Sequence, residues 1–429
     1  MEKITAVRGF KDILPGETEK WRFVENKARE IFADFGIREI KIPILEKTEL
    51  FARGIGETTD IVEKEMYTFR DRGNEYLTLR PEATASVIRA YIEHNMHLNE
   101  QLSRLFTIGP MFRRERPQKG RFRQVHQINV EFIGGNDPRI DAELMIMLVT
   151  FLSSVGLTNV RLEINSLGCP ACRSSFRGTV IDFLRGKEEC LCPDCRRRLD
   201  TNPLRIFDCK VESCQETISS APVILDFICD TCRNHFENTK RYLTMFDISF
   251  SVNPRMVRGL DYYTQTAFEV ITESLGAQNA VAGGGRYDGL VKDLGGEDIP
   301  GVGFAIGFER LVSMIPGDDD DFIDHPHIFI AALGEEATDY AFTLSNRFRL
   351  TGIRAEMDFT GKSLKSQMKR SNKVNARYTL IIGTKELEER QAPLRNMRTG
   401  EQQSLSLETI DGVIHEFTNL LSAETITAG

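Results

Sequence analysis

A cationic segment between two strand-like runs, within residues 106–132, constrains the fold more than any other part of the chain. Residues 106–112 are largely apolar, and residues 127–132 alternate polar and apolar side chains. Such alternation is typical of a half-buried strand, and Pro117 and Gly120 between the two runs indicate a loop. The pattern therefore predicts a strand, a charged loop and a second strand.

The predicted loop is rich in basic side chains, namely Arg113, Arg114, Arg116, Lys119, Arg121 and Arg123. Guanidinium groups bind phosphate oxygens in a bidentate fork, so arginines held between two rigid strands suit a polyphosphate. On the second strand Gln127, Asn129 and Glu131 share one face. If that face is the floor of a pocket, Gln127 and Glu131 could bind a small polar ligand. The alternative is a solvated basic hairpin with an ordinary polar face, because charge runs are usually solvated.

The bulk properties predict a multidomain protein of the cytoplasm. A chain of 429 residues is too long for one core, and we expect about three domains. The sequence has no apolar run long enough for a membrane span, and its charged, mixed N-terminus does not resemble a signal peptide. The formal net charge of -8 argues against coating of nucleic acid by the whole surface, although local basic patches remain.

All nine cysteines lie between Cys169 and Cys232. In a cytoplasmic protein such crowding favours metal over disulfides, and thiolates paired at a Cys-x-x-Cys spacing suit tetrahedral zinc. We hypothesise two sites of four: Cys192, Cys195, Cys209 and Cys214 in one, and Cys169, Cys172, Cys229 and Cys232 in the other, with Cys190 left over. Free thiols in an inserted segment are the alternative.

Periodicity predicts the elements of the first third of the chain. Apolar residues at helical spacing predict a helix over residues 17–35, and the alternating segment 37–43 predicts a strand that ends at Pro43. Glycines and threonines predict a flexible loop over residues 54–59. Residues 67–79 have the pattern of a hairpin, and a helix is expected to follow from Pro81.

The remaining segments predict an inserted helical part and a second sheet. The cysteine-rich block 169–232 has mostly helical patterns, and 256–263 and 267–271 have strand patterns. The acidic tract 316–321 is a linker candidate. Beyond it, three buried strands separated by helices predict an α/β domain with a largely parallel sheet, the strands being 327–333, 353–357 and 378–382.

Several motifs together resemble class II aminoacyl-tRNA synthetases. A strand that ends in a proline, an arginine-bearing hairpin loop and a Gly-x-Gly-x-x-x-Gly-x-x-Arg segment over 301–310 occur in the order found in that class. The peptides RGLDYYT at 258–264 and GGRYD at 284–288 are similar to the two signature peptides of the histidyl-tRNA synthetases. The resemblance runs from Arg8 through the C-terminal domain.

The resemblance implies an α+β catalytic domain with an antiparallel sheet, a mostly helical insertion and a C-terminal α/β anticodon-binding domain. The expected divisions are catalytic parts at 1–168 and 246–316, a cysteine-rich insertion at 169–245, a linker at 317–326 and the anticodon-binding domain at 327–429. The helix and the strand ending at Pro43 resemble the dimer-forming motif of the class, so a homodimer is implied; a simple strand stop at Pro43 is the alternative.

The resemblance also implies the reaction, ATP-dependent attachment of histidine to its tRNA through an adenylate, with ATP, Mg²⁺, L-histidine and tRNA as ligands. Arg113 and Arg310 match the arginines that hold the triphosphate, and Arg258 matches one placed between the histidine carboxylate and the α-phosphate. The implied ATP-binding residues are Arg113, Glu115, Arg121, Gly303, Gly307 and Arg310. The implied catalytic residues are Arg258, Arg113 and Gln127. Helix–strand packing is the alternative role for the two glycines.

The histidine pocket implied by the resemblance comprises Glu82, Thr84, Gln127, Glu131, Arg258, Tyr262, Tyr263 and Tyr287. An imidazole needs a hydrogen-bond donor and an acceptor, which glutamate and tyrosine supply. If 260–263 is a strand, Tyr262 points away from Tyr263 and has a structural role instead. The family's general pattern does not require the cysteines.

Basic side chains near Lys362 are expected to meet tRNA phosphates, although a solvated helix face is the alternative for each of them. They are Lys362, Lys365, Lys369, Arg370, Lys373 and Arg377. Two other functions are open at this point. One is a catalytically inactive regulatory paralogue in histidine biosynthesis, which would be expected to lack the C-terminal domain. The other is a zinc-dependent RNA-binding protein.

Overall fold

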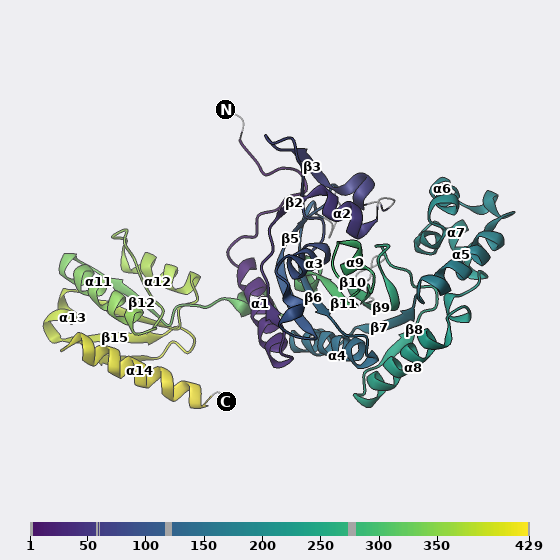
Figure 1. Cartoon of the computed structure of the whole chain (residues 1–429). Helices are drawn as coiled ribbons and strands as arrows, with labels where there is room; N and C mark the ends of the chain where they lie inside the picture. Colours follow the sequence, from purple (N-terminus) through teal and green to yellow (C-terminus); the bar gives the residue numbers. More distant parts are fainter. Residues whose placement is uncertain (1–2, 57–58, 60, 116–121, 273–279, 428–429) are drawn as a thin grey trace. The chain divides into compact units, whose positions relative to one another are not determined.

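The computed structural model describes residues 3–56, 59, 61–115, 122–272 and 280–427 (Figure 1). The chain divides into two compact units, Met1–Phe322 and Ile323–Gly429. Within the described residues no helix has the length and apolar character needed to cross a membrane.

The first unit is built on a sheet whose described strands follow the order β1-β5-β6-β11-β10-β9-β7-β8. The strands are β1 (Arg38–Glu39), β5 (Ser103–Phe112), β6 (Gln124–Ile133), β7 (Arg161–Ser166), β8 (Phe250–Val252), β9 (Thr264–Ile271), β10 (Ala280–Arg286) and β11 (Gly301–Gly307). All neighbours pair antiparallel except β1 with β5 and β7 with β8, at the two edges. The predicted antiparallel sheet is therefore confirmed.

The two faces of this sheet differ in polarity. Ile128, Val130 and Phe132 of β6 belong to the main apolar core, together with residues of the helices α1 (Glu17–Asp34) and α4 (Pro138–Ser154). Because side chains alternate along a strand, the polar residues between them face the opposite side. The period-two pattern of β6 thus separates a buried apolar face from a polar one.

The polar side of the sheet is partly covered by short elements from the first and last parts of the unit. These are α2 (Thr48–Ile55), α3 (Thr84–Glu93), α9 (Leu290–Asp293) and a small sheet of β2 (Leu45–Lys47), β4 (Tyr76–Leu79) and β3 (Tyr67–Arg70). Apolar residues of α3 pack with Leu105 and Met111 of β5 and with Ile133 of β6. The predicted hairpin and the helix after Pro81 are both confirmed.

Two segments before this hairpin differ from the sequence-based expectation. The strand expected over 37–43 is limited to β1. The carbonyl of Ile42 does not pair with a neighbouring strand, because it accepts a hydrogen bond from Nη1 of the buried Arg80 at 2.8 Å. The loop expected to begin at Gly54 begins only after Ile55, where α2 ends. The helix extends this far because Phe51 and Ile55 are buried with Ala85.

The strand expected over 256–263 is also wrong, since these residues form turns and irregular backbone. Their carbonyls bond to arginine side chains from the insertion instead of to a neighbouring strand. Arg173 donates to the Tyr263 carbonyl at 2.8 Å, and Arg205 donates to the carbonyls of Gly259 at 2.8 Å and Arg258 at 3.1 Å. Distant side chains therefore override the local strand pattern.

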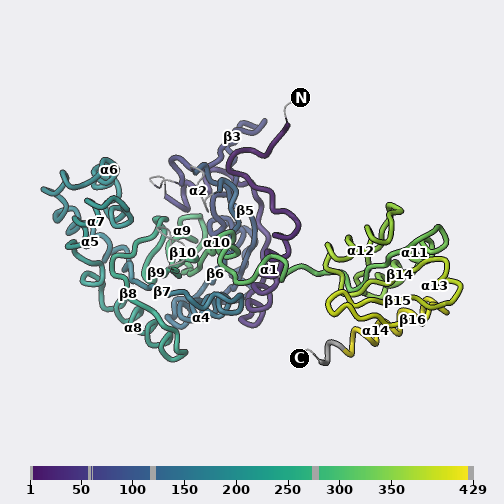
Figure 2. The backbone as a smooth tube through the Cα atoms, turned by 180° about the vertical axis from the view of Figure 1, so that it is seen from behind, coloured from purple at the N-terminus to yellow at the C-terminus, as the bar shows by residue number. Residues whose placement is uncertain are grey.

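The cysteine-rich insertion is mostly helical, as predicted. It contains α5 (Pro170–Leu184), α6 (Pro193–Thr201), α7 (Glu212–Ser219) and α8 (Asp230–Met245), with a 3₁₀ segment at Pro203–Asp208. Figures 1 and 2 show α5, α6 and α7 gathered in a lobe of their own, while α8 runs back along the sheet of the first unit beside α4. The lobe has a separate apolar core to which several cysteines belong.

The second unit is an α/β domain around one sheet of order β13-β12-β14-β15-β16. Its elements are β12 (Ile328–Ala332), α11 (Glu335–Leu350), β13 (Ala355–Met357), α12 (Leu364–Lys373), β14 (Tyr378–Ile382), α13 (Thr384–Glu389), β15 (Gln391–Asn396), β16 (Gln402–Ser406) and α14 (Ile410–Thr427). The strands β13, β12 and β14 are parallel, as predicted. The antiparallel hairpin β15–β16 was not predicted and extends the sheet at one edge.

Candidate active site

A pocket of about 440 Å³ opens on the polar face of the first sheet. It gathers residues that the sequence places far apart: Glu82, Thr84, Arg113, Glu115, Gln127, Arg258, Tyr262, Tyr263, Gly307 and Arg310 all line it. Glu131, Tyr287 and Gly303 lie outside this lining, and Arg121 lies outside the described residues. The pocket therefore combines most of the expected ATP and histidine residues in one space.

Small residues in the middle of the sheet create the floor of this pocket. Ala305 of β11 lies opposite Asn129 of β6, Gly283 of β10 lies opposite Ala305, and Glu269 of β9 lies opposite Gly283. The guanidinium of Arg258 lies over Gly283, where a Cβ atom would come within 2.5 Å of its Nη2. A larger residue at this position would therefore displace Arg258.

Arg258 is the cationic centre of the pocket. Its Nη1 pairs with Oε1 of Glu269, and its guanidinium lies over the Tyr263 ring at 5.4 Å from the ring centre. Although burial opposes the charged form, Tyr263 and Glu269 raise the pKa of Arg258 above its usual value. The buried Nε of Arg258 has no hydrogen-bond partner among the described residues, so one donor remains for an anionic ligand.

Two more arginines border the same space, each oriented by a backbone carbonyl. Nε of Arg113 donates to the Pro81 carbonyl at 2.8 Å, and Nη1 of Arg310 donates to the Ala280 carbonyl at 2.9 Å. Together with Arg258 they come from three separate segments of the chain. Three guanidinium groups around one pocket match the charge and the forked geometry that a triphosphate requires.

Buried carboxylates lie on the side of α3. Glu82 accepts hydrogen bonds from the backbone N–H groups of Thr84 at 2.7 Å and Ala85 at 2.9 Å, so it fixes the start of the helix. Burial raises the pKa of Glu82, and these N–H groups partly oppose the rise. Its position on the pocket wall makes it suitable for an ammonium group.

Glu131 lies just behind the lining and is almost fully buried. Its two oxygens accept from Thr84 Oγ1 at 2.7 Å and from the Tyr287 hydroxyl at 2.6 Å. Burial raises the pKa of Glu131 to about 8, against the opposing effect of these two bonds. The ring of Tyr287 contacts the ring of Tyr262, with 5.8 Å between the ring centres. Thr84 and the tyrosines therefore connect Glu131 to the residues that line the pocket.

The turn at 261–262 places both tyrosines of the signature peptide in the pocket. Because this segment is not a strand, Tyr262 does not point away from Tyr263, and the two rings lie 4.7 Å apart. Burial raises the pKa of both hydroxyls, and the charges of nearby Glu82 and Glu131 add to the rise for Tyr262. Both tyrosines are therefore neutral hydrogen-bonding groups near neutral pH.

The floor also presents two amide groups from β6. The side-chain oxygens of Gln127 and Asn129 are buried, and neither accepts a hydrogen bond from any residue that the structure describes. Both residues line the pocket. Buried polar atoms without partners are rare in folded proteins, so these two amides point to a polar ligand.

Gly303 provides space for Glu131 rather than contact with the pocket. It lies opposite Glu131 across β6 and β11, and a Cβ atom there would be 1.8 Å from Oε2 of Glu131 and 2.6 Å from the Val130 carbonyl. Gly307, in contrast, lines the pocket as expected of a residue that approaches ATP.

Replacing Gly303 with alanine is therefore expected to displace the Glu131 carboxylate and to weaken binding of histidine, the ligand that the resemblance implies, by at least about tenfold, with a stability loss of about 1–3 kcal/mol from overpacking. Isothermal titration calorimetry and chemical unfolding measure the two effects. Gly178→Ala is the matched control, because nothing lies within 4 Å of a Cβ there and alanine favours a helix. Histidine affinity equal to that of the wild type in Gly303→Ala would contradict the assigned role.

The arginine of the second signature peptide is structural. Arg286 is fully buried; its Nε donates to both oxygens of Asp141 at 3.0 Å, and its Nη1 donates to Asp288 at 2.9 Å. Asp141 belongs to α4 and also lies 3.3 Å from His235 of α8. This network ties β10 to both helices and so holds the neighbouring Tyr287 beside Glu131.

Sequence reasoning missed several residues of the lining. Glu269 forms the ion pair with Arg258, and Glu309 accepts from the backbone N–H of His126 at 2.8 Å and lies 3.0 Å from its Nδ1. Phe122 also lines the pocket. A single acid within the otherwise apolar run 267–271 was an available signal for Glu269. The pairing of His126 with Glu309 depends on the contact between β6 and α10 (Phe308–Met314), which no local pattern encodes.

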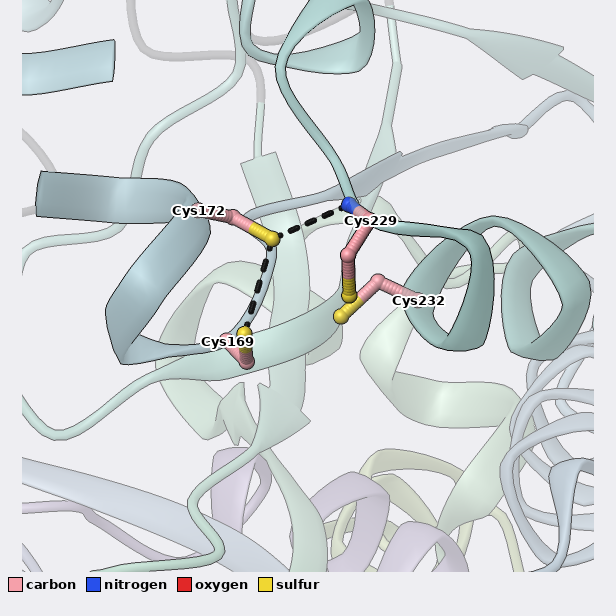
Figure 3. Close-up of side chains that lie close together, drawn as sticks. All are labelled: Cys169, Cys172, Cys229 and Cys232. Carbon is pink, nitrogen blue, oxygen red and sulfur yellow. Dashed lines mark hydrogen bonds between the residues drawn. The ribbon is translucent and has the colours of Figure 1, made fainter. Parts of the chain in front are cut away.

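The eight paired cysteines form two groups, each with its sulfurs within 4.8 Å of one another. One group consists of Cys169, Cys172, Cys229 and Cys232 (Figure 3), and the other of Cys192, Cys195, Cys209 and Cys214. Hydrogen bonds from backbone N–H groups, chiefly those of Cys172 and Cys195, lower the pKa of Cys169 and Cys192 to about 7. The exposed Cys190 belongs to neither group.

An antiparallel sheet with one pocket on its polar face, served by arginines from a strand-loop-strand unit and from a strand-to-helix turn, is the catalytic architecture of a class II aminoacyl-tRNA synthetase. The model of the family described as histidyl-tRNA synthetase matches residues 9–170 and 212–311, and the model of the anticodon binding domain matches residues 327–417. The chain belongs to the histidyl-tRNA synthetase family.

Individual relatives agree over almost the whole chain. A histidine–tRNA ligase of Geobacter sulfurreducens is 55% identical over 94% of this chain and 97% of its own length. One of Syntrophotalea carbinolica is 52% identical over 97% and 99%. The crystal structure of the apo histidyl-tRNA synthetase of S. aureus has 36% identity and a TM-score of 0.81, and it covers 97% of this chain and 100% of that chain.

Proposed function

We propose that this protein is a histidine–tRNA ligase, which activates histidine with ATP and transfers it to tRNA. The observation that carries the proposal is the convergence of Arg113, Arg258 and Arg310 with Glu82 and Gln127 in one pocket. Family membership and the near-complete alignment with histidine–tRNA ligases support the same reaction. The regulatory paralogue is disfavoured, because the C-terminal domain and the three arginines are present. The RNA-binding alternative does not account for the buried carboxylates of the pocket.

In the first step the histidine carboxylate attacks the α-phosphorus of ATP and pyrophosphate leaves. We assign Arg258 to the space between these two anionic groups, where it stabilises the charge that gathers in the transition state. Arg113 and Arg310 hold the triphosphate, so that much of the rate comes from orientation. Gln127 offers an amide to the histidine carboxyl group, and Gly307 allows the nucleotide to approach the backbone.

Family membership implies that ATP acts together with Mg²⁺. The pocket supplies the donor type that this ion prefers beside phosphate oxygens, because the carboxylates of Glu115 and Glu309 line it. When bound, Mg²⁺ would neutralise part of the triphosphate charge. The three arginines that line the pocket would hold the phosphates.

Recognition of histidine is assigned to the α3 side of the pocket. We assign the ammonium group to Glu82 and the imidazole to Glu131 and the Tyr262–Tyr263 pair. With a pKa of about 8, Glu131 carries a proton at neutral pH and shares it with the ring by way of Thr84 and the tyrosines. A pocket of buried polar groups rejects amino acids that leave those groups unpaired.

In the second step a hydroxyl of the terminal ribose of tRNA takes the histidyl group from the adenylate, and AMP leaves. The second unit is assigned to the anticodon. This unit matches the anticodon binding domain, and its helix α12 exposes Lys365 and Lys369 one turn apart. Arg370 on the same helix instead pairs with Asp358 at 3.3 Å. The two lysines are therefore the better candidates for phosphate contacts.

The double variant Lys365→Ala/Lys369→Ala is expected to weaken tRNA binding and to reduce the slope of log K against log salt by about 2, because each phosphate contact contributes about 1. Filter binding over a series of salt concentrations measures the slope. Histidine-dependent pyrophosphate exchange stays unchanged. Lys385→Ala on α13 is the control, since this exposed lysine pairs with Glu389 within its own helix. An unaltered slope in the double variant would contradict the assignment.

We also propose that the protein is a homodimer that pairs near β1. This short edge strand leads into a segment in which Ile44 is 44% exposed and Leu45 is 39% exposed. Neighbouring apolar residues exposed at a sheet edge are typical of an interface. Light scattering of the full chain is expected to give twice the monomer mass, and Ile44→Asp is expected to shift it toward the monomer.

Transfer of labelled histidine to unfractionated tRNA tests the complete function. The protein is expected to charge a single tRNA species with histidine in an ATP-dependent manner. Adenylate formation without any transfer to tRNA would limit the function to the first step, and transfer of a different amino acid would overturn the proposal.

A further inference from the structure

The two groups of cysteines in the insertion have the composition and spacing of metal sites. The Sγ atoms of Cys169 and Cys172 lie 3.5 Å apart, and those of Cys192 and Cys209 lie 3.9 Å apart. Four sulfurs bound tetrahedrally at about 2.3 Å from a zinc ion lie about 3.8 Å from one another. A disulfide would bring two sulfurs to about 2.05 Å. The spacing therefore fits a shared ion and not a disulfide.

The backbone around both groups is arranged for thiolates. Cys169, Cys192 and Cys229 each precede the first turn of a helix of nine residues or more, where N–H groups point toward the sulfurs. The N–H of Cys229 donates to Sγ of Cys172 at 3.1 Å, and the N–H of Cys192 donates to Sγ of Cys214 at 3.1 Å. Such bonds stabilise the charge of metal-bound sulfur and tie the two halves of each group together.

Cysteines make up a large share of the small core of the lobe. Of the 16 buried residues in its core, 5 are cysteines: Cys172, Cys195, Cys209, Cys214 and Cys232. Small units with limited apolar cores usually depend on disulfides or metals for their stability. An ion bound by these cysteines would therefore add to the packing of the helical segments that they join.

We propose that the insertion binds two structural Zn²⁺ ions, one in each group of four cysteines, and that these ions hold the segments supporting the Arg258 loop. The first group fixes the start of α5, where Arg173 follows Cys172 and donates to the Tyr263 carbonyl at 2.8 Å. The second group closes the segment from Cys195 to Cys209. That segment carries Asn202, which donates to Asp261 at 3.0 Å, and Arg205, which donates to the Gly259 carbonyl.

This arrangement links metal to the active site without placing metal in it. Both ions would lie in the lobe. Arg173 and Arg205 of the lobe bond to backbone carbonyls of the loop that carries Arg258, Tyr262 and Tyr263, so the packing of the lobe affects where these side chains lie in the pocket. The effect on catalysis rests on the proposed function. The metal sites themselves do not, because their occupancy is measured without any substrate.

Metal analysis by plasma mass spectrometry of the full-length protein, purified without chelator, tests the sites. The wild type is expected to hold about two zinc ions per chain, and Cys229→Ser and Cys195→Ser about one each. Cys190→Ser, which alters the exposed cysteine outside both groups, keeps about two. Less than one zinc per chain in the wild type, or undiminished zinc in both Cys229→Ser and Cys195→Ser, would overturn the proposal.

A second measurement keeps the proposal testable if the variants fail to fold. In the native wild type, a thiol reagent is expected to modify Cys190 quickly. The other eight cysteines are expected to react only after a mercurial titrant has released the zinc. Rapid native modification of the exposed Cys229 without zinc release would overturn the first site. Removal of zinc is also expected to slow histidine-dependent pyrophosphate exchange at least tenfold, with recovery on adding Zn²⁺. An unchanged exchange rate after complete removal would overturn the link to the loop and leave the metal sites standing.

Discussion

Replacing Arg258 with alanine is expected to lower the rate of histidyl-adenylate formation by about 10²–10³-fold, while histidine affinity falls by less than about tenfold. The guanidinium lies over Gly283 on the pocket floor, is paired with Glu269 and has an unpartnered Nε among the described residues. Charge gathers between the carboxylate and the α-phosphate only as the reaction proceeds. A cation at that point therefore acts mainly on the transition state.

Single-turnover kinetics and calorimetry separate these two effects. Arg258→Lys keeps the charge but loses the fork, so it is expected to recover only part of the rate. Arg258→Ala/Glu269→Gln removes the carboxylate that the first change leaves without its cation, and the double-mutant cycle isolates the effect of that orphaned charge. Arg22→Ala is the matched control, since this exposed arginine lies 3.8 Å from Glu19 within α1 and does not line the substrate pocket. Equal losses in rate and histidine affinity for Arg258→Ala would contradict the role in charge stabilisation.

Replacing Glu131 with alanine is expected to reduce kcat/KM for histidine on the order of 10³-fold. The change removes the carboxyl group assigned to the imidazole and also leaves Thr84 and Tyr287 without their shared acceptor. Because Glu131 is assigned to the binding of histidine, most of the loss is expected as an increase in KM. Glu237→Ala serves as control, since this exposed glutamate pairs with Lys240 within α8 and does not line the pocket. A loss confined to kcat would contradict the assignment.

The pH dependence of histidine binding provides a sharper test of Glu131. Burial raises its pKa to about 8, so below pH 8 the free protein holds the proton that the carboxyl group and the imidazole share. Above pH 8 that proton must be taken up on binding, and the affinity is expected to fall about tenfold per pH unit. In Glu131→Gln only the ammonium group of the ligand titrates, so the decline starts at higher pH. An identical alkaline profile in both proteins would contradict the shared proton.

Local patterns predict the elements of the sheet better than the irregular parts of the site. The alternation along 127–132 correctly predicts β6, because a strand with one apolar and one polar face has no other stable arrangement in this position. The strand pattern at 256–263 fails, because Arg173 and Arg205 supply the hydrogen bonds of that segment from the insertion. Periodicity contains no information about partners that are distant in the sequence.

The candidate site shows the same division. Motif resemblance places Glu82, Arg113 and Gln127 in one pocket, as the structure has them. It does not reveal that Gly303 makes room for Glu131, because that depends on the register between β6 and β11. Nor does it reveal Glu269. This residue contacts Arg258 because Gly283, its neighbour on β10, has no side chain between them.

Amino-acid-dependent exchange between ATP and pyrophosphate tests the central claim most directly, because it reports adenylate formation. The assay requires no tRNA, and its interpretation does not depend on the metal content of the insertion. Each of the twenty amino acids is supplied separately with ATP and Mg²⁺. The account predicts rapid exchange with histidine, little with the others, and loss of the histidine signal in Arg258→Ala. Exchange that is faster with another amino acid, or absent with histidine, would contradict it.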